Sequence, residues 1–134
     1  MHLELSVRTD VALRAIRKLR KVGRRVARRE LAESLSSSPD FLARVMGPLV
    51  SQGWVDSKRG RTGGYELTDA GRSLSVLDVI LVEEGVSTDR CVLRTGPCSP
   101  DENCALHDPW MKAREAMLAE LSTSSAADGS EELA

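Results

Sequence analysis

Residues 54–68 read W-V-D-S-K-R-G-R-T-G-G-Y-E-L-T, and this stretch decides the fold. The short segments at residues 54–55 and 65–67 contain aromatic and β-branched side chains, which predicts two short strands. Residues 59–64 lie between them and hold three glycines and two arginines, a composition that predicts the tip of a β-hairpin.

Two helices are predicted ahead of this hairpin from the spacing of the apolar residues. Residues 9–22 carry apolar side chains at helical intervals, with Thr9 as the expected N-cap and Gly23 as the expected end. A second helix is expected over residues 27–35, and the serines that follow it are expected to form a turn.

A third helix is expected from residue 39 to about residue 52. Ser38 is a good N-cap, and Pro39 then occupies the first helical position, where its missing N–H costs nothing. Pro48 is expected to bend the last turn, because proline cannot donate the helical hydrogen bond. Three helices followed by a hairpin predict a winged helix–turn–helix domain over residues 1–68, with the third helix in the major groove of DNA.

The charge is divided between the two halves of the chain. Residues 1–61 contain 14 Lys and Arg against 6 Asp and Glu, a balance of +8. Residues 62–134 contain 5 against 14, a balance of −9, so the net charge of −1 conceals the division. A basic half can be a solvated surface, but it is also what a polyanion binder needs, because each phosphate contact releases counterions. We therefore expect the N-terminal half to bind double-stranded DNA.

The C-terminal half is expected to hold a linking helix and a dimerisation helix. Residues 69–107 are predicted to contain a helix over 76–84 and then a loop without clear periodicity. Asp108 is expected to cap a last helix over residues 108–121, and residues 122–134 are small, polar and acidic, which predicts a disordered tail. The predicted fold class is mostly α with a small β-hairpin wing, a winged helix–turn–helix plus a long C-terminal dimerisation helix. The apolar stripe expected to pack against a second copy of the chain consists of Trp110, Ala113, Met117 and Leu121.

Cys91, Cys98, Cys104 and His107 lie within seventeen residues, and the chain has no other cysteine. An odd number of thiols in a cytoplasmic setting argues against disulfides, and close thiols resist ionising together unless a cation lies among them. Zinc accepts three cysteines and a histidine, but its ligands usually pair at short spacing. The intervals of six and five residues between the cysteines favour an iron–sulfur cluster over zinc, and inert thiols are the least favoured alternative.

Membrane proteins, secreted proteins and hydrolytic enzymes are not expected from this sequence. No apolar run approaches bilayer length, so we expect no membrane span and no membrane partner. The first ten residues lack the apolar stretch of a signal peptide, so we expect a cytoplasmic protein. His2 and His107 are the only histidines, and neither lies in a nucleophile–base motif, so we expect no enzyme.

Three motifs together resemble one family. T-D-V-A-L-R-A at residues 9–15, R-G-R-T-G-G-Y-E-L-T at residues 59–68 and the spacing of the cysteines are similar to the Rrf-two family of bacterial regulators, the IscR-, NsrR- and RirA-like proteins. The resemblance covers residues 1 to about 121. It implies a homodimer with crossed C-terminal helices, an iron–sulfur cluster near the dimer interface and a palindromic operator in double-stranded DNA.

The resemblance implies that Cys91, Cys98 and Cys104 ligate the cluster, and it leaves two alternatives for the fourth ligand. In NsrR-like members an aspartate at the start of the first helix, from the partner subunit, ligates a 4Fe–4S cluster, and Asp10 matches that position. In IscR-like members a histidine three residues after the last cysteine ligates a 2Fe–2S cluster, and His107 matches that one. We favour Asp10 and a 4Fe–4S cluster, because the segment around Asp10 is close to the NsrR form.

The resemblance also locates the expected DNA contacts. The family reads base edges from the start of the third helix, while the start of the second helix suits phosphate contacts. The arginine-bearing hairpin tip suits a minor groove or phosphates. The residues expected to contact DNA are Arg28, Arg29, Ser38, Asp40, Arg44, Lys58, Arg59, Gly60 and Arg61.

The predicted function is a cluster-dependent transcription regulator that acts as a repressor. Nitric oxide, oxidants or iron shortage would damage the cluster and release the DNA. One alternative is a zinc-bound or metal-free winged-helix regulator. Another, from a different class, is an iron–sulfur electron-transfer protein, which would leave the basic half poorly explained.

Overall fold

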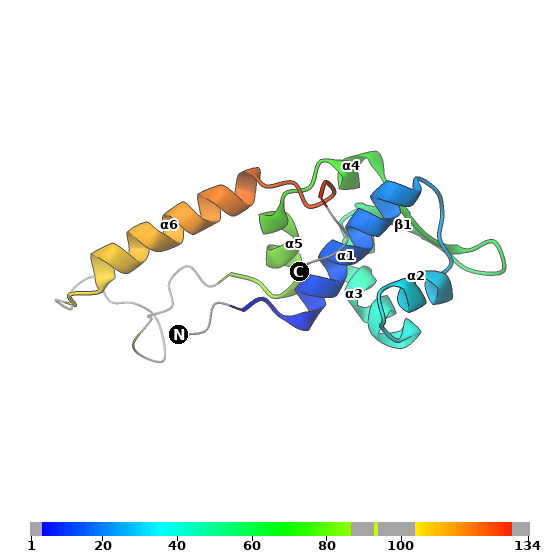
Figure 1. Ribbon diagram of the computed structural model, residues 1–134, viewed down its shortest axis with the longest axis horizontal. Helices are drawn as coiled ribbons and strands as arrows, with labels where there is room; N and C mark the ends of the chain where they lie inside the picture. The colour runs from blue at the N-terminus through cyan, green and yellow to red at the C-terminus, as the bar shows by residue number, and fades with distance from the viewer. Residues whose placement is uncertain (1–3, 87–92, 94–103, 130–134) are drawn as a thin grey trace.

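The computed structural model describes residues 4–86, 93 and 104–129. Three helices and a two-stranded antiparallel hairpin come first along the chain, and further helices follow them (Figure 1). This arrangement confirms the predicted fold class, mostly α with a hairpin wing. Within the described ranges, no helix is both long and apolar enough to cross a bilayer. The elements are α1 (Val7–Val22), α2 (Arg28–Ser34), α3 (Pro39–Ser51), β1 (Val55–Lys58), β2 (Gly64–Leu67), α4 (Asp69–Arg72), α5 (Val76–Glu83) and α6 (His107–Thr123).

Helix α1 begins earlier than predicted. The Oγ of Ser6 accepts a hydrogen bond from the Thr9 N–H at 3.3 Å, so Ser6 is the N-cap. The prediction that Thr9 caps this helix is wrong, because Thr9 lies fully buried in the first turn and its hydroxyl donates to Glu84. Gly23 ends the helix as predicted, with φ at 68° and its N–H donating to the Leu19 carbonyl at 3.0 Å.

Helices α2 and α3 form the helix–turn–helix pair. The Oγ of Ser38 accepts a hydrogen bond from the Phe41 N–H at 3.1 Å, and Pro39 is the first helical residue, as predicted. Helix α3 continues past Pro48, whose carbonyl accepts a hydrogen bond from the Gln52 N–H at 3.1 Å. The bend expected at Pro48 stays a prediction.

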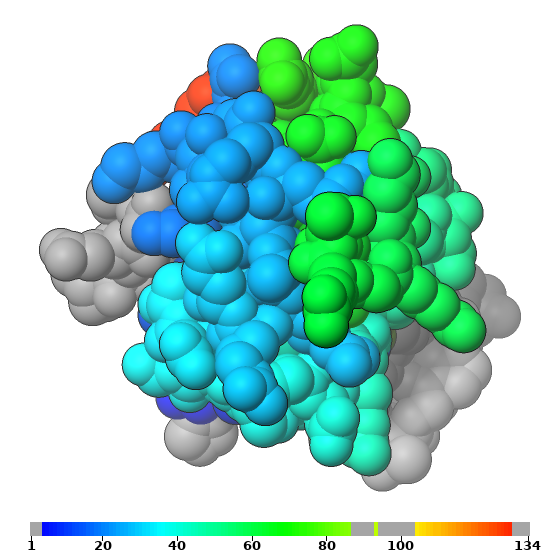
Figure 2. All heavy atoms as spheres, turned by 90° about the vertical axis from the view of Figure 1, so that its right-hand side faces the viewer, coloured from blue at the N-terminus to red at the C-terminus, as the bar shows by residue number. Residues whose placement is uncertain are grey.

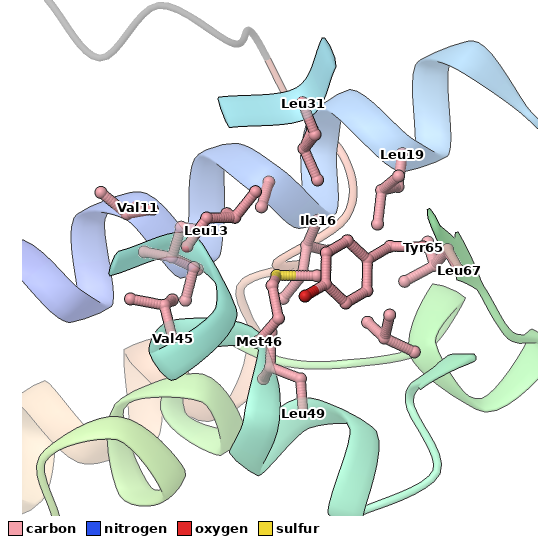
Figure 3. Close-up of a cluster of buried hydrophobic side chains, with 14 of the residues drawn as sticks. Val11, Leu13, Ile16, Leu19, Leu31, Val45, Met46, Leu49, Tyr65 and Leu67 are labelled. Carbon is pink, nitrogen blue, oxygen red and sulfur yellow. The ribbon is translucent and has the colours of Figure 1, made fainter. Parts of the chain in front are cut away.

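The core lies between α1, α3 and the wing. Figure 3 shows the ring of Tyr65 pointing from β2 into a cluster that includes Ile16 and Leu19 of α1 and Met46 and Leu49 of α3. These four aliphatic side chains are at most 1% exposed. Burying a side chain of this size stabilises a fold by roughly 1.5–3 kcal/mol. The core therefore fixes both α3 and the wing to one scaffold, α1.

The wing pairs β1 with β2 in antiparallel register, with Val55 opposite Leu67 and Lys58 opposite Gly64. Strand β1 extends to Lys58, beyond the strand predicted at residues 54–55. The hairpin is also joined to the connection between α1 and α2. Val26 of that connection and Tyr65 of β2 exchange two backbone hydrogen bonds, of 2.9 and 2.8 Å.

Two short helices lead from the wing toward the C-terminal helix. Helix α4, capped by Thr68, is absent from the prediction, because four residues are too few to show a periodic pattern. Helix α5 begins with a reciprocal capping box between Ser75 and Asp78.

Helix α6 begins at His107, and its N-cap, Leu106, makes no side-chain hydrogen bond. The prediction that Asp108 caps this helix is therefore wrong. The His107 N–H donates to the Cys104 carbonyl at 3.1 Å, so the chain already turns before the helix and Asp108 falls inside the first turn. None of the residues of α6 is buried, and Figure 1 shows this helix lying apart from α1, α2 and α3.

Residues 124–129, which we call the C-terminal clasp, return to the core. Ala126 and Ala127 are 0% and 3% exposed, and the Ala126 N–H donates to the Leu74 carbonyl at 2.8 Å. We expected a disordered tail from residue 122, and the structure differs over the clasp. Composition predicted disorder there, but two methyl groups and a few backbone hydrogen bonds suffice to hold a short segment against a core.

Candidate nucleic-acid interface and cysteine segment

Exposed cations gather on α2, α3 and the wing. All nine residues predicted to contact DNA are exposed. Six of them are cations, and in the described part of the chain none of these six side chains forms an ion pair. Other basic groups are neutralised, as Arg24 is by Glu30 at 3.3 Å and Arg14 by Asp10 at 3.7 Å. The six unpaired cations are Arg28, Arg29, Arg44, Lys58, Arg59 and Arg61.

A groove of about 580 Å³ lies between the start of α2 and the wing. Arg28 and Arg29 line it from α2, and Lys58 and Arg59 line it from the hairpin. Figure 2 looks onto this end of the molecule, where the start of α2 (light blue) lies beside the wing (green). Tyr65 also lines the groove, and burial raises the pKa of its hydroxyl, against the opposing charge of Arg28. Four cations around one groove suit the phosphate backbone of a nucleic acid.

The first turn of α3 presents Ser38 and Asp40 to solvent, and Arg44 is exposed one turn further on. The Ser38 oxygen accepts the capping hydrogen bond from Phe41, and the hydroxyl can still donate to a base or a phosphate. An aspartate in this place can accept from a cytosine amine, and an arginine can bind guanine with two hydrogen bonds. Helix α3 therefore carries the side chains that base readout needs.

Two glycines allow the tight path of the wing. A Cβ at Gly63 would lie 2.3 Å from the Lys58 carbonyl oxygen, and a Cβ at Gly64 would lie 2.1 Å from the Val26 carbonyl oxygen. The φ of Gly64 is 127°, a conformation that other residues rarely adopt. Gly63 thus allows the tight path of the hairpin tip, and Gly64 allows the wing to lie against the connection between α1 and α2.

Arg25 fixes the base of the wing, and sequence reasoning missed it. Its Nη1 donates to the Asp56 carbonyl at 3.2 Å and to the Gly64 carbonyl at 3.0 Å. Its Nη2 pairs with the Asp56 carboxylate and lies 3.6 Å from a carboxylate oxygen of Glu66. The side chain is only 17% exposed, so Arg25 positions the wing and does not belong to the cationic surface. In the sequence it is one arginine of a basic run, and nothing there distinguishes it.

The structure describes only part of the predicted cluster site. Cys91 and Cys98 lie outside the described residues. Cys104 is a free, half-buried thiol within one turn of His107, as the hydrogen bond between their backbone groups shows. Asp10 lies in the first turn of α1, and its side chain is 41% exposed and 3.7 Å from Arg14. Among the described residues, no three potential metal ligands come together, so Asp10 is not joined to Cys104 and His107 within this chain.

The end of α5 holds the first turn of α1. One carboxylate oxygen of Glu84 accepts hydrogen bonds from the Ser6 N–H at 3.1 Å and from the hydroxyls of Ser6 and Thr9. One oxygen of Glu83 accepts from Arg8 at 3.1 Å. Burial raises the pKa of Glu83 to about 7, although the charge of Arg8 opposes the shift. Partial burial acts the same way on Glu84, but the hydrogen bonds from Thr9 and Ser6 outweigh it and hold the Glu84 pKa below its ordinary value.

Known proteins similar to this chain are bacterial transcription regulators. The family model described as "Rrf2: Iron-dependent Transcriptional regulator" matches residues 5–130. The HTH-type transcriptional repressor NsrR of Streptomyces coelicolor is 33% identical over 122 residues, which cover 89% of this chain and 82% of that protein.

Solved structures of similar regulators share the fold along most of the chain. CymR, the global cysteine regulator of B. subtilis, has a TM-score of 0.77 at 24% identity and covers 93% of this chain and 94% of its own, a likeness that shows the fold alone. The oxidized form of Staphylococcus aureus CymR has a TM-score of 0.71 at 26% identity, with the same coverage of 93% and 94%. The IscR of T. potens has a TM-score of 0.71 at 25% identity and covers 96% of this chain and 86% of its own.

Proposed function

Because the chain belongs to the Rrf2 family of transcriptional regulators, we propose that it is a dimeric repressor whose DNA binding depends on an iron–sulfur cluster. The chain is a winged-helix transcription regulator and not an enzyme. The proposal adds a sensor, a cluster ligated by Cys91, Cys98 and Cys104, through which nitric oxide, redox state or iron supply controls DNA binding. It also adds a palindromic operator, a homodimer and a cytoplasmic location.

The observation that carries the proposal is a three-cysteine segment attached directly to a DNA-binding unit. Helix α5 packs on α1 and α3, and the segment with the cysteines follows it in the chain. The unpaired cations on α2, α3 and the wing form the other end of the same unit. A change in the segment that follows α5 can therefore act on α1 and α3 through the packing of α5.

The donor set fits an iron–sulfur cluster. Three thiolates are typical cluster ligands, and Cys104 is a free thiol with His107 one turn away. When bound, a cluster supplies a centre that reacts with nitric oxide and oxidants. The role of Cys91, Cys98 and Cys104 is to hold the cluster. The role of a fourth ligand is to make cluster binding depend on a second segment of the protein.

We propose Asp10 of the partner subunit as the fourth ligand, with His107 as the alternative. Asp10 of this chain is accessible to a second copy, because its side chain is 41% exposed and its ion pair with Arg14, at 3.7 Å, is itself partly exposed. His107 follows Cys104 by one turn and would complete the site within a single chain. The first alternative goes with a 4Fe–4S cluster, which we favour, and the second with a 2Fe–2S cluster.

A zinc-bound or metal-free regulator is the second candidate. The observation that favours it is the likeness to CymR of Staphylococcus aureus. The CymR of B. subtilis is described as a global cysteine regulator, and a regulator of that kind does not need a cluster. The electron-transfer alternative has no such support, because the similar proteins are transcription regulators.

The test is the visible absorption spectrum of anaerobically purified protein, together with iron and sulfide counts. The proposal predicts a coloured protein with iron and sulfide in equal numbers, and loss of the colour in Cys91→Ala, Cys98→Ala and Cys104→Ala. Asp10→Ala is expected to alter the spectrum, and His107→Ala to leave it unchanged. A colourless protein with one zinc and no sulfide would establish the second candidate instead.

A further inference from the structure

Arg8 joins the end of α5 to the DNA-reading helix α3. One guanidinium nitrogen, Nη2, donates to the Glu83 carboxylate at 3.1 Å and to the backbone carbonyl of Arg44 at 3.3 Å. Glu83 is the last residue of α5, and its side chain is 0% exposed. Arg44 lies in the middle of α3, with its own side chain among the unpaired cations. A single side chain of α1 thus bridges two other helices.

Pro48 explains why the Arg44 carbonyl is available. In an α-helix the carbonyl of residue 44 accepts from the N–H of residue 48, but proline has no N–H to donate. The Arg44 carbonyl therefore lacks its usual donor within the helix, and Arg8 supplies a hydrogen bond to it from outside the helix. The proline therefore makes the middle of α3 depend on a contact from α1.

The other end of the bridge, Glu83, lies eight residues before Cys91 in the sequence. Glu83 is followed by Glu84, which holds Ser6 and Thr9 in the first turn of α1. That turn carries both Arg8 and Asp10. The first turn of α1 thus joins the end of α5 to α3 at one junction, which we define by Arg8, Glu83 and the Arg44 carbonyl, and the same turn carries the proposed ligand Asp10.

We propose that Arg8 is a positioning residue that makes the placement of α3 depend on the end of α5. The inference rests on the proposed function for what moves the end of α5, namely gain or loss of the cluster in the following segment. While Glu83 holds Arg8, the guanidinium supports α3 in the orientation that reads DNA. When the end of α5 shifts, Arg8 leaves the Arg44 carbonyl and α3 loses that support.

The test is a four-protein comparison of operator affinity, using wild type, Arg8→Met, Pro48→Ala and the double variant. The probe is a duplex selected from random-sequence DNA by the iron-loaded wild-type protein, and each protein is measured both iron-loaded and after anaerobic chelation of iron. Arg8→Met is expected to weaken operator binding of the loaded protein roughly tenfold, the effect of losing a hydrogen bond from a charged group. In the Arg8→Met variant, the iron-loaded and the chelated protein are also expected to bind the operator with nearly equal affinity.

Pro48→Ala gives α3 its own N–H donor for the Arg44 carbonyl, so the contact with Arg8 becomes dispensable. In that background Arg8→Met is expected to change the affinity by less than about twofold. If Arg8→Met weakened DNA binding only by destabilising the fold, the loss of affinity would be the same in wild type and in Pro48→Ala. Arg20→Met is the matched control, because Arg20 lies on the same helix and pairs with Asp128 at 4.0 Å.

Equal effects of Arg8→Met in the two backgrounds, or no effect in either, would overturn the proposal. If Arg8→Met fails to fold, Arg8→Lys serves in its place, since lysine keeps the charge but its ammonium ends one bond short of the Nη2 that makes both contacts. If wild-type affinity does not change on chelation, the cluster-dependent function fails. The comparison between the wild-type and Pro48→Ala backgrounds then still decides whether Arg8 positions α3.

Discussion

Arg29 and Arg59 line the same groove from opposite sides, and neither is held by a carboxylate of the described chain. If each contacts a phosphate, Arg29→Ala and Arg59→Ala will each reduce the slope of log K against log salt by about 1. The weakening should be nearly the same for operator and for unrelated DNA, because a phosphate contact carries no sequence information. The measurement is the binding constant at a series of salt concentrations.

The control for these two variants is Arg20→Ala, which removes the same charge from the far end of α1. A salt slope that stays at the wild-type value in Arg59→Ala would count against the assignment of the wing to DNA. The cluster spectrum should be unchanged in all three proteins.

Glu83 predicts a pH dependence of stability. Its pKa in the folded protein is raised from 4.5 to about 7 by burial, so the folded state holds the proton more tightly than the unfolded state. The corresponding stabilisation is complete below pH 4.5 and is lost as pH rises through 7, at most about 3 kcal/mol for a shift of this size. Glu83→Gln removes this titration, so the stability of the variant relative to wild type should rise between pH 5 and pH 8.

The measurement is the urea midpoint of the two proteins, prepared with identical iron content, at both pH values. The charges that face Glu83, Arg8 and Glu84, are present in both proteins, so their own effects largely cancel. A relative stability that stays constant, or that falls with rising pH, contradicts the burial argument.

Single-residue predictions succeeded where the signal was local. Ser38 and Pro39 start α3 as expected, because a cap and a proline at the first position act within one turn. Thr9 was mistaken for a cap because Ser6, three residues earlier, has the same chemistry, and only the distant Glu84 decides between them. The hydrogen bond from Arg8 to Arg44 could not be foreseen, since it joins side chain and backbone across 36 residues.

At the scale of the elements, the wing is held by Arg25 and not only by strand pairing. Arg25→Ala should weaken operator binding by roughly tenfold while leaving the salt slope at its wild-type value, because Arg25 meets carbonyls and carboxylates instead of phosphates. Arg25→Lys should bind the operator nearly as weakly as Arg25→Ala, since a single ammonium cannot donate to all the acceptors that the guanidinium reaches. The measurement is the same salt series as for Arg29→Ala.

Full affinity in Arg25→Lys would show that charge alone suffices and would contradict this role. A slope reduced by about 1 in Arg25→Ala would instead place the side chain on DNA.

The order of the main elements could be predicted because each has a strong periodic or turn signal. Helices α1 and α3 have wide apolar stripes, and the glycines between β1 and β2 identify the hairpin. Helix α4 was missed because it has four residues and is set by the Thr68 cap and by packing. The boundaries differ by a residue or two where a backbone hydrogen bond, and not a side chain, begins the element, as at His107.

At the scale of the whole molecule, the C-terminal clasp returns the end of α6 to the core. Deleting residues 124–134 removes two buried alanines and the hydrogen bond from Ala126 to Leu74. We expect a loss on the order of 2 kcal/mol in the free energy of unfolding. The measurement is urea unfolding of the truncated protein beside a control that lacks only residues 130–134. Equal free energies of unfolding in the two truncated proteins would show that the C-terminal clasp does not stabilise the fold.

The charge of the two halves and the cysteines predict a DNA-binding end and a sensing segment, and the sensing role of that segment stays a prediction. The fourth ligand stays a prediction: the sequence favours Asp10 over His107, and a ligand from a second subunit leaves no trace in one chain. The clasp was missed because its small residues give no periodic signal, even though two of them, Ala126 and Ala127, are buried.

The central claim is that the cluster controls DNA binding, and the most direct measurement is the operator affinity of one wild-type preparation before and after the cluster is removed. The iron-loaded protein is compared with the same sample after treatment with nitric oxide and after anaerobic chelation, at a fixed salt concentration. The account predicts at least roughly tenfold weaker binding in both treated samples, a change of about 1.4 kcal/mol in binding free energy. A protein that binds the operator equally well with and without iron would contradict it.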